Sequence, residues 1–255
     1  DGSIIAVQKG SDILMAYNKR GKLLWTYSIG KKEGWRTIWD YKLSRDGRYT
    51  VIAMYREEEG FLDLKRYYEL VLLRDGKVVW VKSEEGIHKV AISSNNAYIA
   101  SASVVYVDPD FNVTRISLYT INGAKLWSTV VEGFPSDVGV SSSGEVVLST
   151  MINNIFRTYF IKNGHVLWTK DRCHGAQFTR NEDRIVVIRK RGENRSDWDV
   201  NVFNREGELL WEHRGAYRFA VADNYYVLAG GEPGSEEVVL VSADGVVLQR
   251  IKLRE

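Results

Sequence analysis

The sequence has little of several features that would point to a particular class of protein. It contains one cysteine, Cys173, which excludes an internal disulfide and a cysteine-rich metal site. Lys plus Arg (35) nearly balances Asp plus Glu (33), so a net charge of +2 gives no global field for nucleic acid or an anionic membrane. The longest apolar runs, such as ASASVVYV, fall short of the roughly 20 residues that a membrane-spanning helix needs.

Helical periodicity is also missing, because nowhere does an apolar period of about 3.6 residues persist over three turns. Short segments such as DILMAY, YELVLL and EVVLVS are instead rich in the β-branched and aromatic residues typical of strands. These patterns predict an all-β fold.

What the sequence does have is a repeat in which a tryptophan follows a glycine by four residues. The copies are GKLLW (21–25), GKVVW (76–80), GAKLW (123–127), GHVLW (164–168), GELLW (207–211) and a degenerate GVVLQ (245–249). Their spacing of roughly 40 to 55 residues is typical of propeller blades and too long for leucine-rich repeats.

Turn residues stand at four of the six motif glycines, as Asp75-Gly76, Asn122-Gly123, Asn163-Gly164 and Asp244-Gly245. Because these residues tolerate positive φ, we predict a two-residue type I′ hairpin at each. Between the motif copies, segments such as VAISSNNAYIASAS contain an apolar strand, a polar turn and another apolar strand. Each repeat is therefore predicted to form four antiparallel strands, A to D, with the C/D hairpin at the motif glycine.

We accordingly predict a single domain over residues 1–255, a six-bladed β-propeller. The blades lie at approximately 1–33, 34–86, 87–133, 134–173, 174–215 and 216–255. The first blade lacks its inner strand, because DGSIIAVQKG has the pattern of the end of an A/B turn followed by strand B. We expect an upstream segment or a strand from a partner to complete it.

The motif tryptophans are predicted to cover the seams between blades, since a four-stranded blade is apolar on both faces. They are Trp25, Trp80, Trp127, Trp168 and Trp211. A buried indole removes about 150–250 Å² from water, which stabilises each seam by several kcal/mol before entropy is subtracted.

The pattern Asp-Gly-Lys-x-x-Trp resembles the tryptophan-docking repeat of PQQ-like and related WD40-like β-propellers. The quinone enzymes of that family typically have eight blades, a vicinal disulfide and calcium-binding carboxylates. One cysteine rules out that disulfide here, and we assign no quinone, other cofactor or metal residue to this chain.

Antiparallel strand order places the B/C and D/A loops on one rim, with the mouth of the central channel. The D/A junctions there carry residues suited to a polar ligand or a peptide. They are Arg36, Trp39, Asp40, His88, Lys89, Asp137, His174, Tyr217 and Arg218, together with Trp35 and Ser136. The alternative is that these polar loop ends are hydrated or paired with one another.

Two B/C insertions, YREEEGFLDLKRYYE and RKRGENRSDWD, are predicted on the same rim. The second places basic residues around Trp198, which suits an acidic partner or single-stranded nucleic acid, or else forms a solvated hairpin. His88 and His174 occupy equivalent positions but lack a clear third metal ligand. Cys173 and His174 are adjacent on a strand and point to opposite faces, so we expect an unreactive thiol rather than a catalytic dyad.

Two functions remain open. The first is a non-catalytic binding or scaffolding module that recognises a protein or a surface polymer, with no strong signal for nucleic acid. The alternative is a lyase or hydrolase acting on a sugar or peptide at the channel mouth. The lack of a recognisable set of acid, base and nucleophile favours the first. Sequons at Asn112 and Asn194 permit glycosylation of an exported or cell-envelope protein, and the abundance of charge is thermophile-like.

Overall fold

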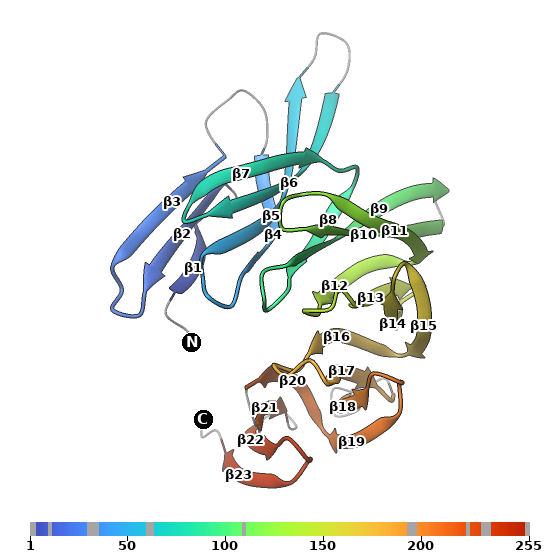
Figure 1. The fold of residues 1–255 in the computed structure, drawn as a ribbon. Coiled ribbons are helices and arrows are strands. Elements are labelled where there is room, and N and C mark those ends of the chain that lie inside the picture. The colour runs from blue at the N-terminus through green and yellow to red at the C-terminus, as the bar shows by residue number, and fades with distance from the viewer. Residues whose placement is uncertain are drawn as a thin grey trace. The chain divides into compact units, whose positions relative to one another are not determined.

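The computed structural model contains only β-strands as regular elements in the residues that it describes (Figure 1). The described residues are 4–9, 12–29, 36–59, 64–108, 111–192, 198–222, 225–230 and 236–252. The prediction of an all-β fold is confirmed. Over these ranges the structure has no helix of the length and apolarity needed to cross a membrane.

Residue contacts divide the chain into two compact units, Asp1–Gly144 and Glu145–Glu255, which are described separately. Unit 1 begins with a three-stranded sheet of β1 (Ile4–Lys9), β2 (Ile13–Asn18) and β3 (Leu23–Ser28). The next sheet is formed by β4 (Arg36–Leu43), β5 (Tyr49–Glu59), β6 (Leu64–Arg74) and β7 (Lys77–Ser83). The third contains β8 (Ile87–Ile92), β9 (Tyr98–Asp108), β10 (Phe111–Thr120) and β11 (Lys125–Glu132), and β12 (Phe134–Val140) follows.

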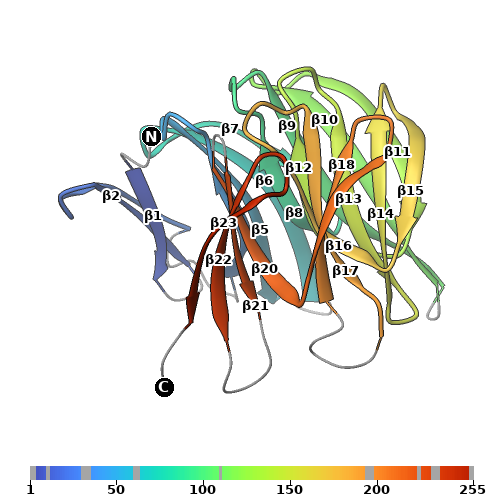
Figure 2. The ribbon, with the colours of Figure 1, turned by 90° about the horizontal axis from the view of Figure 1, so that it is seen from below.

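Unit 2 continues the same pattern of antiparallel neighbours, which Figure 2 shows most clearly for β20, β21 and β22. Its first three strands are β13 (Val146–Ile152), β14 (Ile155–Lys162) and β15 (His165–Asp171). The next four are β16 (Cys173–Phe178), β17 (Arg184–Lys190), β18 (Trp198–Asn204) and β19 (Leu209–Arg214). The last four are β20 (Ala216–Val221), β21 (Tyr225–Gly230), β22 (Glu237–Ser242) and β23 (Val247–Lys252).

In chain order these strands form six consecutive sets that fit a six-bladed β-propeller, and the sets match the predicted blade ranges except that β16 begins one residue early, at Cys173. The first set has three strands and the others have four, with β12 to β15 as the fourth set. Over the described part of the first blade, the predicted lack of an inner strand is confirmed. The prediction that the whole chain forms one domain stays a prediction.

The type I′ hairpin is correct at two of the four predicted turns. At Asp75-Gly76 both residues have positive φ (50° and 78°), and Asn163-Gly164 has the same geometry (51° and 78°). At Asn122-Gly123 and Asp244-Gly245 only the glycine does (85° and 84°), so the prediction is wrong there. The amide of Gly123 donates to the carbonyl of Thr120 at 2.9 Å, as in a type I turn followed by a glycine bulge. The loops at Gly123 and Gly245 contain more residues than a two-residue hairpin, so only the glycine must adopt the left-handed conformation.

The motif glycine of one sheet lies against the motif tryptophan of the sheet before it. A Cβ added to Gly76 would lie 2.7 Å from Cγ of Trp25, and one added to Gly245 would lie 2.7 Å from Cγ of Trp211. Such distances are far below ordinary carbon contacts of about 3.5–4.0 Å. Only a glycine therefore lets the following turn approach the indole so closely.

The indole is also held by a hydrogen bond to the same turn. Nε1 of Trp80 donates to the carbonyl of Ile121 at 2.9 Å in unit 1. In unit 2, Nε1 of Trp168 donates to the carbonyl of Arg205 at 2.8 Å, and Trp211 donates to Ala243 at 3.0 Å. Each acceptor stands two residues before a motif glycine, so the glycine and the tryptophan of the repeat form the two halves of one contact.

Apolar side chains fill the space behind these contacts. One cluster joins the second and third sheets of unit 1 and consists of buried residues from both: Val51, Ala53, Leu70, Leu72, Ile87, Val90, Ile99 and Tyr119. A similar cluster in unit 2 joins the last two sheets through Val186, Val200, Val202, Ala216, Tyr226, Leu228, Val239 and Val241. The core thus lies between sheets, which leaves the strand ends and their loops to present functional side chains.

Candidate functional site

In unit 1, two of the predicted site residues occupy β-bulges in the first strand of their sheets. The register of β4 against β5 shifts between Ile38 and Asp40, which leaves Trp39 outside the ladder. The register of β8 against β9 shifts in the same way between Ile87 and Lys89, at His88. A bulge re-aims the side chain that it carries, and the two rings meet with centroids 4.1 Å apart.

These rings belong to a longer aromatic row in unit 1, formed by Phe134, His88, Trp39, Tyr55 and Tyr68. Phe134 lies edge-on to His88 at 4.7 Å, and Trp39 stacks on Tyr55 at 5.1 Å and meets the edge of Tyr68 at 5.8 Å. Burial, assisted by the charge of Lys89, lowers the pKa of His88 to about 4. The imidazole is therefore neutral near pH 7 and serves as part of an apolar platform.

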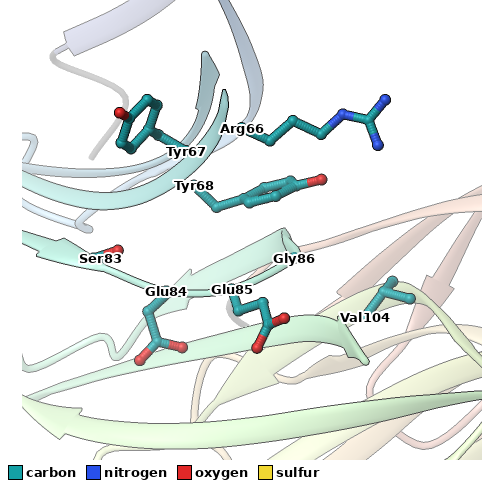
Figure 3. Close-up of a pocket in the computed structure, with 8 residues that line it drawn as sticks. All are labelled: Arg66, Tyr67, Tyr68, Ser83, Glu84, Glu85, Gly86 and Val104. Atoms are coloured by element: carbon teal, nitrogen blue, oxygen red, sulfur yellow. The ribbon is translucent and has the colours of Figure 1, made fainter. Parts of the chain in front are cut away.

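The aromatic row ends at a pocket of about 370 Å³ in unit 1. Its lining comes from the start of β6, the end of β7 with the connection to β8, and the middle of β9: Arg66, Tyr67, Tyr68, Ser83, Glu84, Glu85, Gly86 and Val104 (Figure 3). Arg66 and Tyr68 share one face of β6 because they are two residues apart. Figure 3 shows the Tyr68 ring between the Arg66 side chain and the two carboxylates.

The charged groups of this pocket differ in how they are held. Glu84 is buried and binds Nζ of Lys125 at 3.2 Å and the hydroxyl of Tyr119. Glu85 is exposed and has no ion-pair partner in the part of the chain that the structure describes. Arg66 is 62% exposed and pairs with Glu57 at 3.3 Å, a surface contact that contributes little stability. The pocket thus offers a carboxylate, a guanidinium and a tyrosine to an incoming molecule.

A second group of predicted residues lies on β4, β8 and β12 of unit 1. Oδ2 of Asp40 accepts a hydrogen bond from the amide of Val90 at 3.0 Å. Burial raises the pKa of Asp137, while the charges of Lys42 and Lys89 act in the opposite direction. The structure therefore brings Asp40, Lys89 and Asp137 into one electrostatic group.

Lys42 was missed by the sequence analysis. It stands two residues after Asp40 on β4 and so lies on the same face of that strand, which was the available signal.

Three of the predicted residues lie in unit 2. The ring of His174 lies between Phe156 at 4.5 Å and Trp198 at 4.9 Å, and burial lowers its pKa. Tyr217 is half-buried at a bulge in β20, and the adjacent Arg218 is exposed.

A few predicted positions lie beyond what the structure describes. Arg36 is described only in its backbone, within β4. Trp35 and the sequon at Asn194 lie outside the described residues.

The structure bears on two chemistries considered from the sequence, a reactive thiol at Cys173 and a metal site. Cys173 is 1% exposed, and burial raises the pKa of its thiol to about 12, so the thiol stays protonated near neutral pH. Within the described ranges, no group of three or more His, Cys, Asp or Glu side chains is placed to hold a metal ion.

Comparison with known proteins shows the fold and no more. No protein-family model matches the chain, and no curated protein matches it. Among solved structures, the WD40 repeats of RRP9 match with a TM-score of 0.59 and 10% identity, covering 99% of this chain and 78% of that one. The β-propeller domain of the Trilobed protease from Pyrococcus furiosus matches with a TM-score of 0.58 and 12% identity, covering 87% and 71%.

A prolyl endopeptidase structure has a TM-score of 0.63 and 15% identity. It matches over 100% of this chain but only 42% of its own length. The chain therefore has the β-propeller fold, and its structural neighbours include WD40-repeat proteins as well as peptidases. Function must be argued from the site, because one fold supports many activities.

Proposed function

We propose that the protein is a non-catalytic binding or scaffolding propeller that recognises another protein or a surface polymer through its B/C and D/A loops. The observation that carries the proposal is the pocket at the end of the aromatic row, where Tyr68, Arg66 and Glu85 stand together. Tyrosine and arginine are enriched among the residues that dominate protein interfaces. The WD40 neighbours agree with this role at the level of fold class.

The geometry of the pocket suits a segment of another macromolecule. Its volume of about 370 Å³ lies at the lower end of the range for ligand sites, enough for one or two side chains. Tyr68 is backed by Trp39 and Tyr55, so little conformational entropy is lost when a partner packs on it. Groups of both charge signs at the edge favour a partner that also carries both.

We also propose a relationship to the PQQ-like propellers within this fold. It is supported by the indole hydrogen bonds of Trp80 and Trp168 to the turn of the following sheet. We further propose that a strand from a partner or from an upstream segment completes the first sheet, which has three strands.

Site-specific photo-crosslinking tests the binding role. A benzophenone amino acid at position 85 places the probe at the pocket, and the same amino acid at Lys77, exposed at the opposite end of strand β7, is the control. We expect a cross-linked macromolecule in cell extract from position 85 and not from position 77, and loss of that product when Arg66→Glu is added. Equal cross-linking from both positions would refute the proposed surface.

A second candidate function, hydrolysis or elimination on a sugar or peptide, is favoured by one observation. Asp137 is a partly buried carboxyl whose pKa is raised by desolvation, close to Asp40 and to the cations Lys42 and Lys89. A carboxyl of this kind holds its proton to higher pH and can act as a general acid. Turnover of model glycosides or peptides that is lost in Asp137→Asn, with the fold retained, would favour this candidate over the binding role.

A further inference from the structure

The corner between β15 and β16 holds an arginine where other corners hold a glycine. Gly86, Gly133 and Gly215 stand directly before the first strand of a sheet, with φ of 66°, 94° and 79°. Arg172 occupies the same place before β16, with φ of 61°. This left-handed conformation is disfavoured for a residue that has a Cβ.

Hydrogen bonds show that the corners are equivalent. The amide of Arg172 donates to the carbonyl of Phe156 at 2.6 Å, as the amide of Gly215 donates to Trp198 at 2.9 Å. The carbonyl of Arg172 accepts from the amide of Lys190 at 2.8 Å, in the manner of Gly86 in its own sheet. The backbone requires a left-handed residue here, and glycine would supply it without strain. An arginine in this place points to a use for its side chain.

Among the residues that the structure describes, no carboxylate neutralises the charge of Arg172. Its Nη1 donates to the carbonyl of Arg191 at 3.0 Å, and over the described residues no carboxylate lies within ion-pair distance of it. Nearby guanidinium groups differ in this respect. Arg157 pairs with Asp171 at 2.5 Å, and Arg191 pairs with the buried Asp199.

Two shallow hollows in unit 2 share Arg172 and Ile155 as lining residues. The first, about 150 Å³, is lined by Asn154, Ile155, Phe156, Arg172, Lys190 and Gly192. The second, about 230 Å³, is lined by Ile152, Asn153, Ile155, Arg157, Asp171 and Arg172. Ile155 is 52% exposed, so an apolar surface stands beside the cation. The charged residues that line the hollows are Arg157, Arg172, Lys190 and Asp171, and the carboxylate of Asp171 is already paired with Arg157. The net charge of the lining is therefore positive.

We propose that these hollows bind an acidic segment of a partner protein. A carboxylate of the segment pairs with Arg172, and a neighbouring apolar side chain packs on Ile155. A planar guanidinium suits bidentate binding of a carboxylate. The inference rests on the proposed binding role and adds the chemistry of a partner at a separate site.

A nucleic-acid strand fits these hollows less well. Binding of single strands relies on aromatic faces that are open to stacking by bases. Here Phe156, His174 and Trp198 pack on one another, so their rings already have partners. Ile155 offers an aliphatic surface, which suits a leucine-like side chain better than a base.

Fluorescence anisotropy with a labelled peptide of repeated Glu-Glu-Leu tests the proposal. The parent protein should bind this peptide, and a Gln-Gln-Leu peptide should bind at least about tenfold more weakly because the charged hydrogen bond is lost. Arg172→Gly should weaken binding of the acidic peptide by a similar factor. Its thermal unfolding midpoint should not fall, because glycine relieves the strained φ.

Arg189→Gln is the matched control. Arg189 is exposed, precedes Lys190 on β17 and therefore points to the opposite face of the strand, away from the hollows. This variant removes the same charge and should leave the affinity for the acidic peptide within about twofold of the parent, as expected for a charge outside the contact.

Several results would overturn the inference. They are no binding of the acidic peptide at millimolar concentration, equal loss in Arg189→Gln and Arg172→Gly, tighter binding of a single-stranded oligonucleotide, or a fall in the unfolding midpoint of Arg172→Gly that accounts for the lost binding. The cross-linking test at position 85 probes unit 1, so the general binding role and this site can fail separately.

Discussion

An alanine placed at Gly76 should destabilise the protein more than an alanine placed at Gly21. The two glycines have nearly the same φ, 78° and 76°, so the backbone strain of the substitution is the same, about 1–2 kcal/mol. Their surroundings differ. A Cβ at Gly76 would lie 2.7 Å from Cβ and from Cγ of Trp25, whereas nothing lies within 4 Å of one at Gly21. Displacing the indole adds about 1–3 kcal/mol at Gly76.

Urea unfolding followed by tryptophan fluorescence measures both free energies. We expect Gly21→Ala to lose about 1–2 kcal/mol and Gly76→Ala about 2–5 kcal/mol. Adding Trp25→Leu should make Gly76→Ala less harmful than it is alone, since the smaller side chain leaves room for the methyl group. Equal losses in the two alanine variants, within about 0.5 kcal/mol, would show that the seam does not depend on the approach of glycine to the indole.

Three further predictions concern other parts of the structure. Trp80→Phe should destabilise the fold by about 1–3 kcal/mol in the same assay, because the carbonyl of Ile121 loses its donor; an unchanged midpoint would contradict this. Burial lowers the folded-state pKa of His88 from 6.5 to about 4, so the unfolded chain binds a proton in that window that the folded chain does not. The free energy of unfolding should therefore fall as the pH drops from 6.5 to 4, by about 1–2 kcal/mol after screening by solvent. The variant His88→Phe should show a shallower fall across this range. The same slope in both proteins would show that His88 is not the cause. Cys173 should resist a thiol reagent at pH 8 until urea unfolds the protein, and fast labelling of the native state would show that its thiol is accessible.

The repeat made most of the fold predictable. Glycine and tryptophan recur at blade spacing, and the strands between them have clear β patterns, so the six sets of strands follow from local residues. Turn type was harder to predict, because it depends on how many residues separate the strands. Asn163-Gly164 closes a two-residue loop, whereas Asn122-Gly123 lies in the longer loop between Thr120 and Lys125.

The sequence pointed to Trp39 and His88, but it did not point to Glu85 or to the contacts that form the pocket. Trp39 and His88 were expected at the same rim, yet their stacking depends on bulges in β4 and β8, for which neither strand carries a Gly or Pro signal. Tyr68 belonged to a B/C insertion noted in the sequence, and its role in the pocket depends on the packing of a neighbouring sheet. The left-handed φ of Arg172 had no local signal, because arginine is not a residue expected in that conformation.

The pairing of indole and glycine gives the chain a direction. Each complete contact joins a tryptophan of one sheet to the turn that comes later in sequence, as Trp25 does with Gly76 and Trp168 with Gly207. A sheet copied in tandem would bring an acceptor turn for its predecessor and a donor ring for its successor, so a duplicated sheet would carry both halves of this contact. Exchanging two sheets would also preserve these contacts between tryptophan and turn. Replacing the glycine of a single turn would disrupt the contact that this turn makes.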